Sequence, residues 1–209
     1  MDLDTVEVRV LGCLVEKQHT TPDTYPLSLN SLRLACNQST NRDPVVEYDE
    51  VTIRAALDRL GRRRWTRLAS GAGSRAVKYR HLLEEALALP GAELAVLTVL
   101  MLRGAQTPGE LRQRAERMHV ISDQAVLQAA LERLIERDLA VRLARRPGQK
   151  EERYAHRLSE DLEEEEEATA PTRAATPVAE ETRVDRLERE VATLAAQVAE
   201  LRAALGLEP

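Results

Sequence analysis

Residues 7–22, EVRVLGCLVEKQHTTP, align without a gap with residues 93–108, ELAVLTVLMLRGAQTP. Two further matches follow in the same order, and they pair AALDRL at 55–60 with AALERL at 129–134 and YRH at 79–81 with YAH at 154–156. Three ordered matches predict that the chain holds two copies of one structural unit. The first copy carries extra residues in its middle.

Each copy is predicted to contain three helices followed by a two-stranded hairpin, from the spacing of apolar residues and from capping and turn signals. In the first copy we expect helices at Leu3–Lys17, from Ser28 to about Asn37 and from Asp49 onward, then strands at Trp65–Ser70 and Arg75–Arg80. In the second copy we expect helices at Gly91–Arg103, after the capping box Thr107-Pro-Gly-Glu110 and from Ser122 onward, then strands at Ala140–Ala144 and Glu151–Ala155.

Three helices followed by a hairpin is the element order of a winged helix. We therefore expect a mainly α fold with small β-hairpins, built from two tandem winged-helix (helix-turn-helix) domains and a C-terminal coiled-coil helix. The predicted segments are winged-helix domains at 1–84 and 85–159, an acidic disordered linker at 160–176 and a coiled-coil helix at 177–206.

The formal charge of −5 is unevenly distributed. Residues 1–82 hold 13 basic and 10 acidic side chains, residues 83–158 hold 12 and 11, and residues 159–209 hold 5 and 14. The acidity therefore lies in the last quarter of the chain, and both copies are mildly basic. The net charge does not exclude a nucleic-acid ligand, because binding depends on how charge is distributed over the surface.

Composition disfavours several other classes of protein. Two cysteines without C-x-x-C spacing are too few for a disulfide framework and indicate a reducing compartment. The most apolar window, 94–102, is shorter than the ~20 residues that cross a bilayer, and the acidic N-terminus lacks a signal pattern. The four histidines have no metal-ligand spacing, and no nucleophile–base pair stands out. We expect a cytoplasmic protein without enzymatic activity, cofactor, metal or membrane partner.

The first copy contains the run EKQHTTPDTYPLSLNSLRLACNQSTNRDPV at residues 16–45. Its blocks TTPD, YPLSLN, ACNQ and NRDPV, in this order, resemble the signature of the YceH family of bacterial proteins, and the resemblance extends to about Leu158. It implies a tandem winged-helix fold and a regulatory or DNA-binding role, and it implies no substrate or ligand. This chain has Arg64-Trp65 at the start of the first wing, where the resemblance implies a small-apolar pair such as Gly-Leu.

The third helix of the first copy and the wing after it are the candidate DNA-binding surface. The predicted core stripe is Ile53, Ala56, Leu57 and Leu60, and the opposite face carries Val51, Ala55, Asp58, Arg59 and Arg62. Arg54 and Arg59 are candidates for reading bases, and the other basic residues are candidates for phosphate contacts. The candidate DNA-binding residues are Thr52, Arg54, Arg59, Arg62, Arg63, Arg67, Arg75 and Lys78. The alternative is a solvated helix end whose arginines only keep the domain soluble.

The second copy is expected to differ in role. Its third helix places Glu132 and Glu136 on the outward face, and two carboxylates would repel phosphate. Its first helix, apolar on nearly all sides over 94–102, is expected to be buried all round. We therefore expect this copy to contact protein, either the first domain or a dimer partner.

The extra residues of the first copy, 38–45, are rich in Asn, Asp and Pro, which predicts a tight, internally hydrogen-bonded loop. Asn37, Gln38, Asn41 and Arg42 either present donors to a nucleic acid or small ligand, or cap helix ends and brace the loop.

The C-terminal segment carries Val or Leu in a seven-residue repeat that is typical of parallel coiled-coil dimers. The predicted dimerisation residues are Val184, Leu187, Val191, Leu194, Val198, Leu201 and Leu205. The alternative is a single amphipathic helix that packs on the chain's own domains.

The sequence thus predicts a homodimeric DNA-binding transcriptional regulator that uses its first winged-helix copy. The alternative is an interaction scaffold whose winged helices bind a protein partner.

Overall fold

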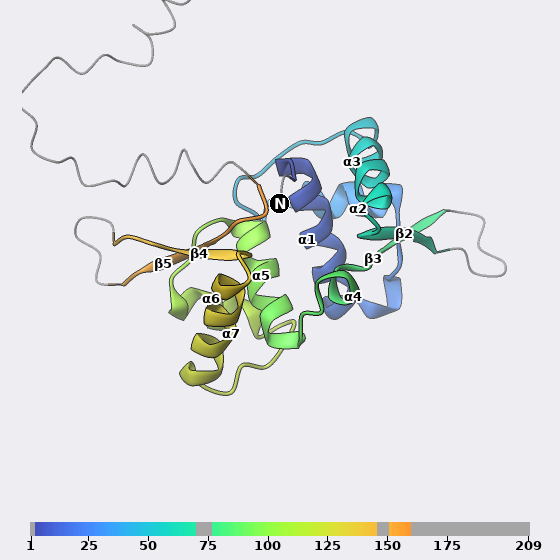
Figure 1. Cartoon of the computed structure of the whole chain (residues 1–209). Helices are drawn as coiled ribbons and strands as arrows, with labels where there is room; N and C mark the ends of the chain where they lie inside the picture. Colours follow the sequence, from blue (N-terminus) through green and yellow to red (C-terminus); the bar gives the residue numbers. More distant parts are fainter. Residues whose placement is uncertain (1–2, 70–76, 146–150, 160–209) are drawn as a thin grey trace, which may run out of the picture. The chain divides into compact units, whose positions relative to one another are not determined.

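The computed structural model of the chain describes residues 3–69, 77–145 and 151–159. These residues form a mixed α structure with two small antiparallel sheets (Figure 1). The first part comprises α1 (Thr5–Thr20), η1 (Pro22–Thr24), β1 (Leu27–Ser28), α2 (Leu29–Cys36), α3 (Glu50–Arg62), β2 (Thr66–Ala69) and β3 (Lys78–His81). After α4 (Leu83–Leu87) come α5 (Gly91–Arg103), α6 (Pro108–Ala115), α7 (Gln124–Glu136), β4 (Ala140–Leu143) and β5 (Arg153–His156). Three helices followed by a hairpin occur twice, an order compatible with a winged helix.

The two hairpins are extended in equivalent ways. In the first sheet β3 lies between β2 and β1, and Leu27 of β1 pairs with Tyr79. In the second sheet β5 pairs with β4, and Gln106 forms an isolated bridge with Tyr154. Tyr79 and Tyr154 are matched positions of the repeat, so both hairpins receive a third backbone segment at the same place. Neither β1 nor this bridge is predicted from the sequence.

Capping residues set most of the helix starts. Asp4 caps α1 in a capping box with Glu7, so α1 begins at Thr5 and not at the predicted Leu3. The predicted capping box of Thr107 with Glu110 is confirmed at α6. Asp123 caps α7 by accepting the Val126 N–H, so α7 begins at Gln124 and the predicted start at Ser122 was two residues early.

The predicted strands were longer than those observed. β2 occupies 66–69 within the predicted 65–70, and β3 begins at Lys78 and ends at His81. The hairpin tips at 70–76 and 146–150 lie outside the described residues, as do the predicted linker and coiled-coil helix within 160–209.

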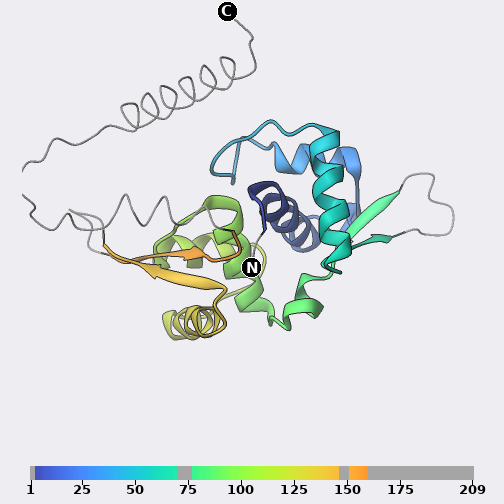
Figure 2. The same ribbon diagram turned by 45° about the horizontal axis from the view of Figure 1, so that its top comes forward.

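The first helices of the two copies pack against each other in one hydrophobic core (Figures 1 and 2). A Cβ atom built on Gly12 of α1 would lie 2.9 Å from the Leu102 side chain of α5, so the two helices approach closely at this point. Residues 93–102 of α5 are all buried, which confirms the predicted burial on every side. α1 of the same chain therefore covers part of this apolar surface, and α6 and α7 also pack on α5.

No helix among the residues that the structure describes is both long and apolar enough to cross a membrane.

Candidate nucleic-acid interface

The two faces of α3 are divided as the sequence predicts. Asp49 caps the helix by accepting the Thr52 N–H at 2.7 Å. The predicted stripe of Ile53, Ala56, Leu57 and Leu60 is buried. The exposed residues of the opposite side are Val51, Arg54, Ala55, Asp58 and Arg62, whereas Thr52 is half-buried.

Arg59 lies on this helix but its guanidinium is engaged within the protein. Its Nε donates to Oε1 of the buried Glu7 at 3.2 Å, and its Nη2 pairs with Asp4. Both carboxylates belong to the first turn region of α1, so Arg59 joins α3 to α1. A guanidinium held by two carboxylates has little remaining attraction for a base edge or a phosphate, and we remove Arg59 from the candidate base-reading residues.

The second copy repeats this ion pair. Arg133 of α7 pairs through Nε with Glu93 of α5, and Glu93 is also buried. Glu7 aligns with Glu93 and Arg59 aligns with Arg133 in the two repeat matches. A buried carboxylate on the first helix is thus neutralised by an arginine on the third helix in both copies, which marks the pair as part of the fold.

The turn after α3 places further arginines at the surface. Trp65 N–H donates to Leu60 O at 2.9 Å and Arg64 N–H to Gly61 O at 3.0 Å, and Arg64 has φ of 60°. These two bonds and the left-handed residue form a Schellman motif, in which glycine is the favoured residue. The left-handed conformation at position 64 therefore explains why the family resemblance implies a small residue there. Asp138 occupies the matching place after α7, with φ of 55°.

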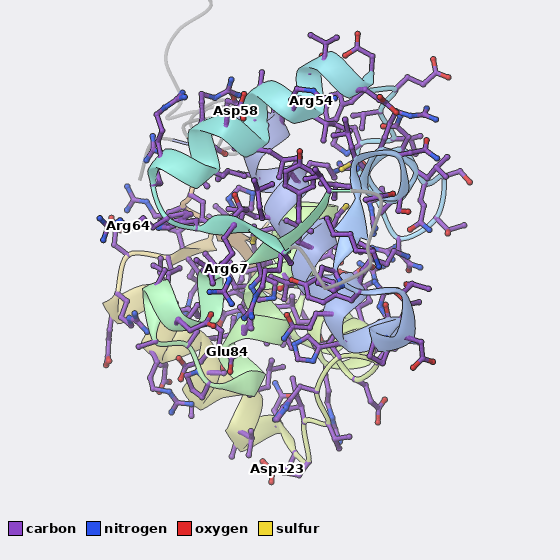
Figure 3. All side chains as sticks on the ribbon, turned by 90° about the vertical axis from the view of Figure 1, so that its right-hand side faces the viewer. Arg54, Asp58, Arg64, Arg67, Glu84 and Asp123 are labelled. Carbon is purple, nitrogen blue, oxygen red and sulfur yellow. The ribbon has the colours of Figure 1, made fainter. Side chains whose placement is uncertain are left out.

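Four arginines form what we call the arginine surface: Arg54, Arg62, Arg64 and Arg67. All four are exposed, and none forms an ion pair with the residues that the structure describes. Figure 3 shows Arg54 on α3, Arg64 on the turn after it and Arg67 on β2. Arg63 is exposed beside them and Lys78 of β3 is half-buried, whereas Arg75 lies outside the described residues.

Carboxylates surround the other end of α3. Glu47, Asp49 and Glu50 are exposed at or before its first turn, and Asp58 is exposed on its outer face (Figure 3). Negative charge there repels phosphate, although it stabilises the helix dipole. The exposed positive charge at the C-terminal end of α3 and the start of the hairpin therefore comes from Arg62, Arg64 and Arg67, whereas Arg54 lies one helical turn from Glu50 and from Asp58. The corresponding face of α7 carries exposed Glu132 and Glu136, as expected for the second copy.

Side chains of the loop between α2 and α3 form hydrogen bonds within the first copy and to α5. The Asn37 side chain exchanges two hydrogen bonds with the backbone of Tyr48, at 2.8 and 2.9 Å. Gln38 accepts from Arg42, and Asn41 accepts from Arg103 at 2.8 Å. Of the two roles considered for these side chains, the structure shows bracing.

Arg42 is the centre of this loop and is fully buried. Its guanidinium pairs with both oxygens of Glu16 on α1 and donates through Nε to Ala35 O at 3.1 Å. Arg117, from the residues after α6, pairs with the same carboxylate. Burial raises the pKa of Glu16, but its bonds and charge interactions with Arg42 and Arg117 outweigh burial and leave that pKa below its usual value. The sequence did not point to this pair, because Glu16 and Arg42 lie far apart in the chain.

Among residues 3–69, 77–145 and 151–159, no three His, Cys, Asp or Glu side chains are grouped so that they could hold a metal ion. Cys13 and Cys36 are free and buried.

Comparison with other proteins places the chain in a family. Residues 3–149 match the sequence model of the family described as "Protein of unknown function, DUF480". A UPF0502 protein of Pelobacter propionicus is 50% identical over 208 residues, which cover 97% of this chain and 94% of that protein. The UPF0502 protein YceH of Salmonella paratyphi C is 46% identical over 213 residues, which cover 98% of both chains. The chain belongs to this family, and the resemblance to YceH is confirmed.

Proposed function

We propose that the chain is a tandem winged-helix protein that binds DNA through the arginine surface and regulates transcription. The observation that carries the proposal is the presence, on α3, the turn after it and β2, of four exposed guanidinium groups that form no ion pair with the described residues. A winged helix that binds DNA places its third helix in the major groove and its hairpin along the backbone. The proposed role is binding, not catalysis.

The position of the charges refines the proposed contact. Arg62, Arg64 and Arg67 lie at the end of α3 and the beginning of the hairpin, so we assign them to phosphates. Arg54 is the remaining candidate for a base edge, because it lies on the outer face of α3 without a carboxylate partner among the described residues. Arg63 and Lys78 are secondary phosphate candidates, and Thr52 is too covered to lead the contact.

The experiment is a titration of a random-sequence DNA duplex followed by fluorescence anisotropy at several salt concentrations. A dimer that neutralises about four phosphates per chain should give a log–log salt slope of about −7, from the ~0.9 counterions released per contact. The double variant R62A/R67A removes about four contacts per dimer, and the slope should fall to about −4.

The matched control is Arg59→Ala, which removes the same charge from the same helix. Because Arg59 is already neutralised by Asp4 and Glu7, the salt slope should stay close to that of the unmodified protein. The free energy of unfolding should fall by about 1–3 kcal/mol, since buried Glu7 loses its partner. Failure of the unmodified protein to bind duplex at about 50 mM salt would overturn the proposal.

Protein binding is the second candidate function, and a specific observation favours it. Val51 on α3 is 75% exposed, and the hairpin exposes Leu68 by 60% and Val77 by 53%. Apolar side chains at these positions would be better covered by a protein than by a DNA backbone. Affinity capture from a bacterial lysate with and without nuclease separates the two, because DNA-mediated capture is lost on nuclease treatment.

A further inference from the structure

A polar pocket of about 370 Å³ lies where α5, α6 and β5 meet the loop before α3. Arg103, Arg114 and Arg153 line it together with Asp43 and Glu110. The remaining lining residues are Ala105, Gln106 and Thr107. The volume is at the lower end of the ~300–1,000 Å³ that is usual for sites of small ligands. The lining is almost entirely charged or polar, so the pocket suits a polar molecule.

Arg153 is buried in this pocket, and its side chain forms no hydrogen bond or ion pair with the residues that the structure describes. Its side chain belongs to β5, its exposed fraction is 8%, and its Nε and Nη2 atoms are covered and donate no hydrogen bond to any acceptor in the described residues. Oε1 of Gln106, which also lines the pocket, is buried and accepts no hydrogen bond from any described residue. A buried guanidinium is strongly disfavoured unless an anion neutralises it. The two backbone hydrogen bonds between Gln106 and Tyr154 hold Arg153 at this place.

The acidic residues of the pocket do not neutralise Arg153. Both oxygens of Glu110 are engaged: Oε2 accepts from the Thr107 N–H and hydroxyl of the capping box, and Oε1 pairs with Arg114 at 3.1 Å. Asp43 interacts electrostatically with Arg103.

Positive charge is also in excess around Arg103, on the same pocket. Its guanidinium donates to the neutral Asn41 side chain at 2.8 Å and has no ion pair among the described residues. Burial lowers the pKa of Arg103, and the nearby charges of Arg114 and Arg117 lower it further. A negative group bound between Arg103 and Arg153 would reverse this unfavourable interaction.

We propose that this pocket binds a small organic anion whose carboxylate or phosphate group pairs with Arg153 and Arg103. An arginine matches either group because its planar donors bond two oxygens at once. Gln106 offers an acceptor to a hydroxyl of the same ligand. The phosphate of a DNA backbone is less suitable, because Arg153 is recessed whereas a duplex contacts side chains that stand out from the surface.

The test is isothermal titration of the full chain with citrate, glycerol phosphate and inorganic phosphate, at constant ionic strength. Glycerol is the neutral control. We expect binding of citrate or glycerol phosphate, and the better of the two identifies the preferred anionic group. Binding of none of the three anions would overturn the proposal.

Two variants test the position of the site. Arg153→Met keeps a long side chain and removes an unpaired charge, so the chain should fold as well as the unmodified protein, while affinity for the anion falls at least tenfold. Arg142→Met is the matched control on β4, because Arg142 is exposed and pairs with Glu152 at 3.6 Å. The affinity of Arg142→Met for the anion should stay within twofold of that of the unmodified protein. Equal effects of the two variants would place the anion elsewhere and overturn the assignment.

The DNA titration separates this proposal from the proposed function. Arg153→Met should leave DNA binding without the anion unchanged, because Arg153 is covered and belongs to β5 of the second hairpin, whereas the arginine surface lies on α3, the turn after it and β2. Loss of DNA binding with unchanged anion affinity in Arg153→Met would show that the pocket receives a DNA phosphate and would overturn the small-anion assignment. Failure of DNA binding in the unmodified protein would leave anion binding intact.

Discussion

His81 and His156 each end the second strand of a hairpin, and each accepts a backbone hydrogen bond through Nδ1. The donors are Leu83 N–H at 3.2 Å and Leu158 N–H at 3.3 Å, two residues further along. Because these two histidines occupy matching positions of the repeat, the sequence favours packing over metal binding as their role. The hydrogen bond that both accept is a structural role of this kind. In His81 the other ring nitrogen, Nε2, is buried and has no hydrogen-bond partner within residues 3–69, 77–145 and 151–159.

The buried ring predicts a loss of stability in acid. Burial lowers the pKa of His81 to about 4, although the charge of Glu85 opposes the shift. Between that value and its ordinary pKa of ~6.5 the unfolded chain binds a proton that the folded chain does not, so stability falls as pH falls. The expected loss is about 2 kcal/mol between pH 7.5 and pH 5, measured by urea unfolding.

The variant His81→Asn should remove most of this loss, because asparagine keeps an acceptor for the Leu83 N–H but does not titrate. His119→Asn is the control, since His119 is exposed. If the free energy of unfolding of His81→Asn still falls between pH 7.5 and pH 5 by as much as that of the unmodified protein, the loss does not come from His81.

Residue roles at the candidate site were only partly predictable. The buried stripe of α3 follows from the spacing of apolar residues and is as predicted, but Arg59 of the predicted outer face is half-buried. The engagement of Arg59 was missed because its partner lies on another helix, and a helical wheel contains only one helix. A signal was nevertheless present: Glu7 matches Glu93 and Arg59 matches Arg133, so a charge pair retained in both copies could have been recognised.

At the scale of elements, prediction succeeded where the signal is local. Apolar periodicity and capping side chains define the three helices of each copy to within a few residues. β1 was missed because it has two residues and exists only through pairing with β3, which follows far along the chain. The short α4 likewise lacks a long apolar period.

Two helical glycines give a prediction about how the elements pack. Gly12 lies where α1 meets α5, and an added Cβ would be 2.9 Å from Cγ and Cδ2 of the buried Leu102. Gly12→Ala should therefore lower the free energy of unfolding by about 1–3 kcal/mol, because the overlap outweighs the gain in helix propensity.

Gly61 of α3 provides the matched control, because an added Cβ there meets nothing within 4 Å. Gly61→Ala should raise the free energy of unfolding by about 0.5–1 kcal/mol through helix propensity alone. Urea unfolding of both variants measures the two effects. Stabilisation by both substitutions would show that α1 and α5 tolerate a wider separation.

At the scale of the whole molecule, the C-terminal repeat of Val and Leu predicts self-association. Sedimentation should give a dimer for the full chain and a monomer after truncation at about Asp161, since the predicted seam is removed. Leu194→Asp should also give a monomer, because Leu194 is a predicted seam residue. Ala196→Asp, away from the seam, should leave the dimer intact. If the truncated chain still sediments as a dimer, the coiled coil is not the dimerising element.

The contact between α1 and α5 also has a consequence for the history of the chain. These are the matched first helices of the two copies, and they cover each other's apolar surface. In a two-fold symmetric dimer, both subunits use the same surface patch to contact each other. An ancestor with one copy would have left this surface open unless two such chains paired. Gene fusion would then have replaced an association that depends on concentration by one that is built into a single chain.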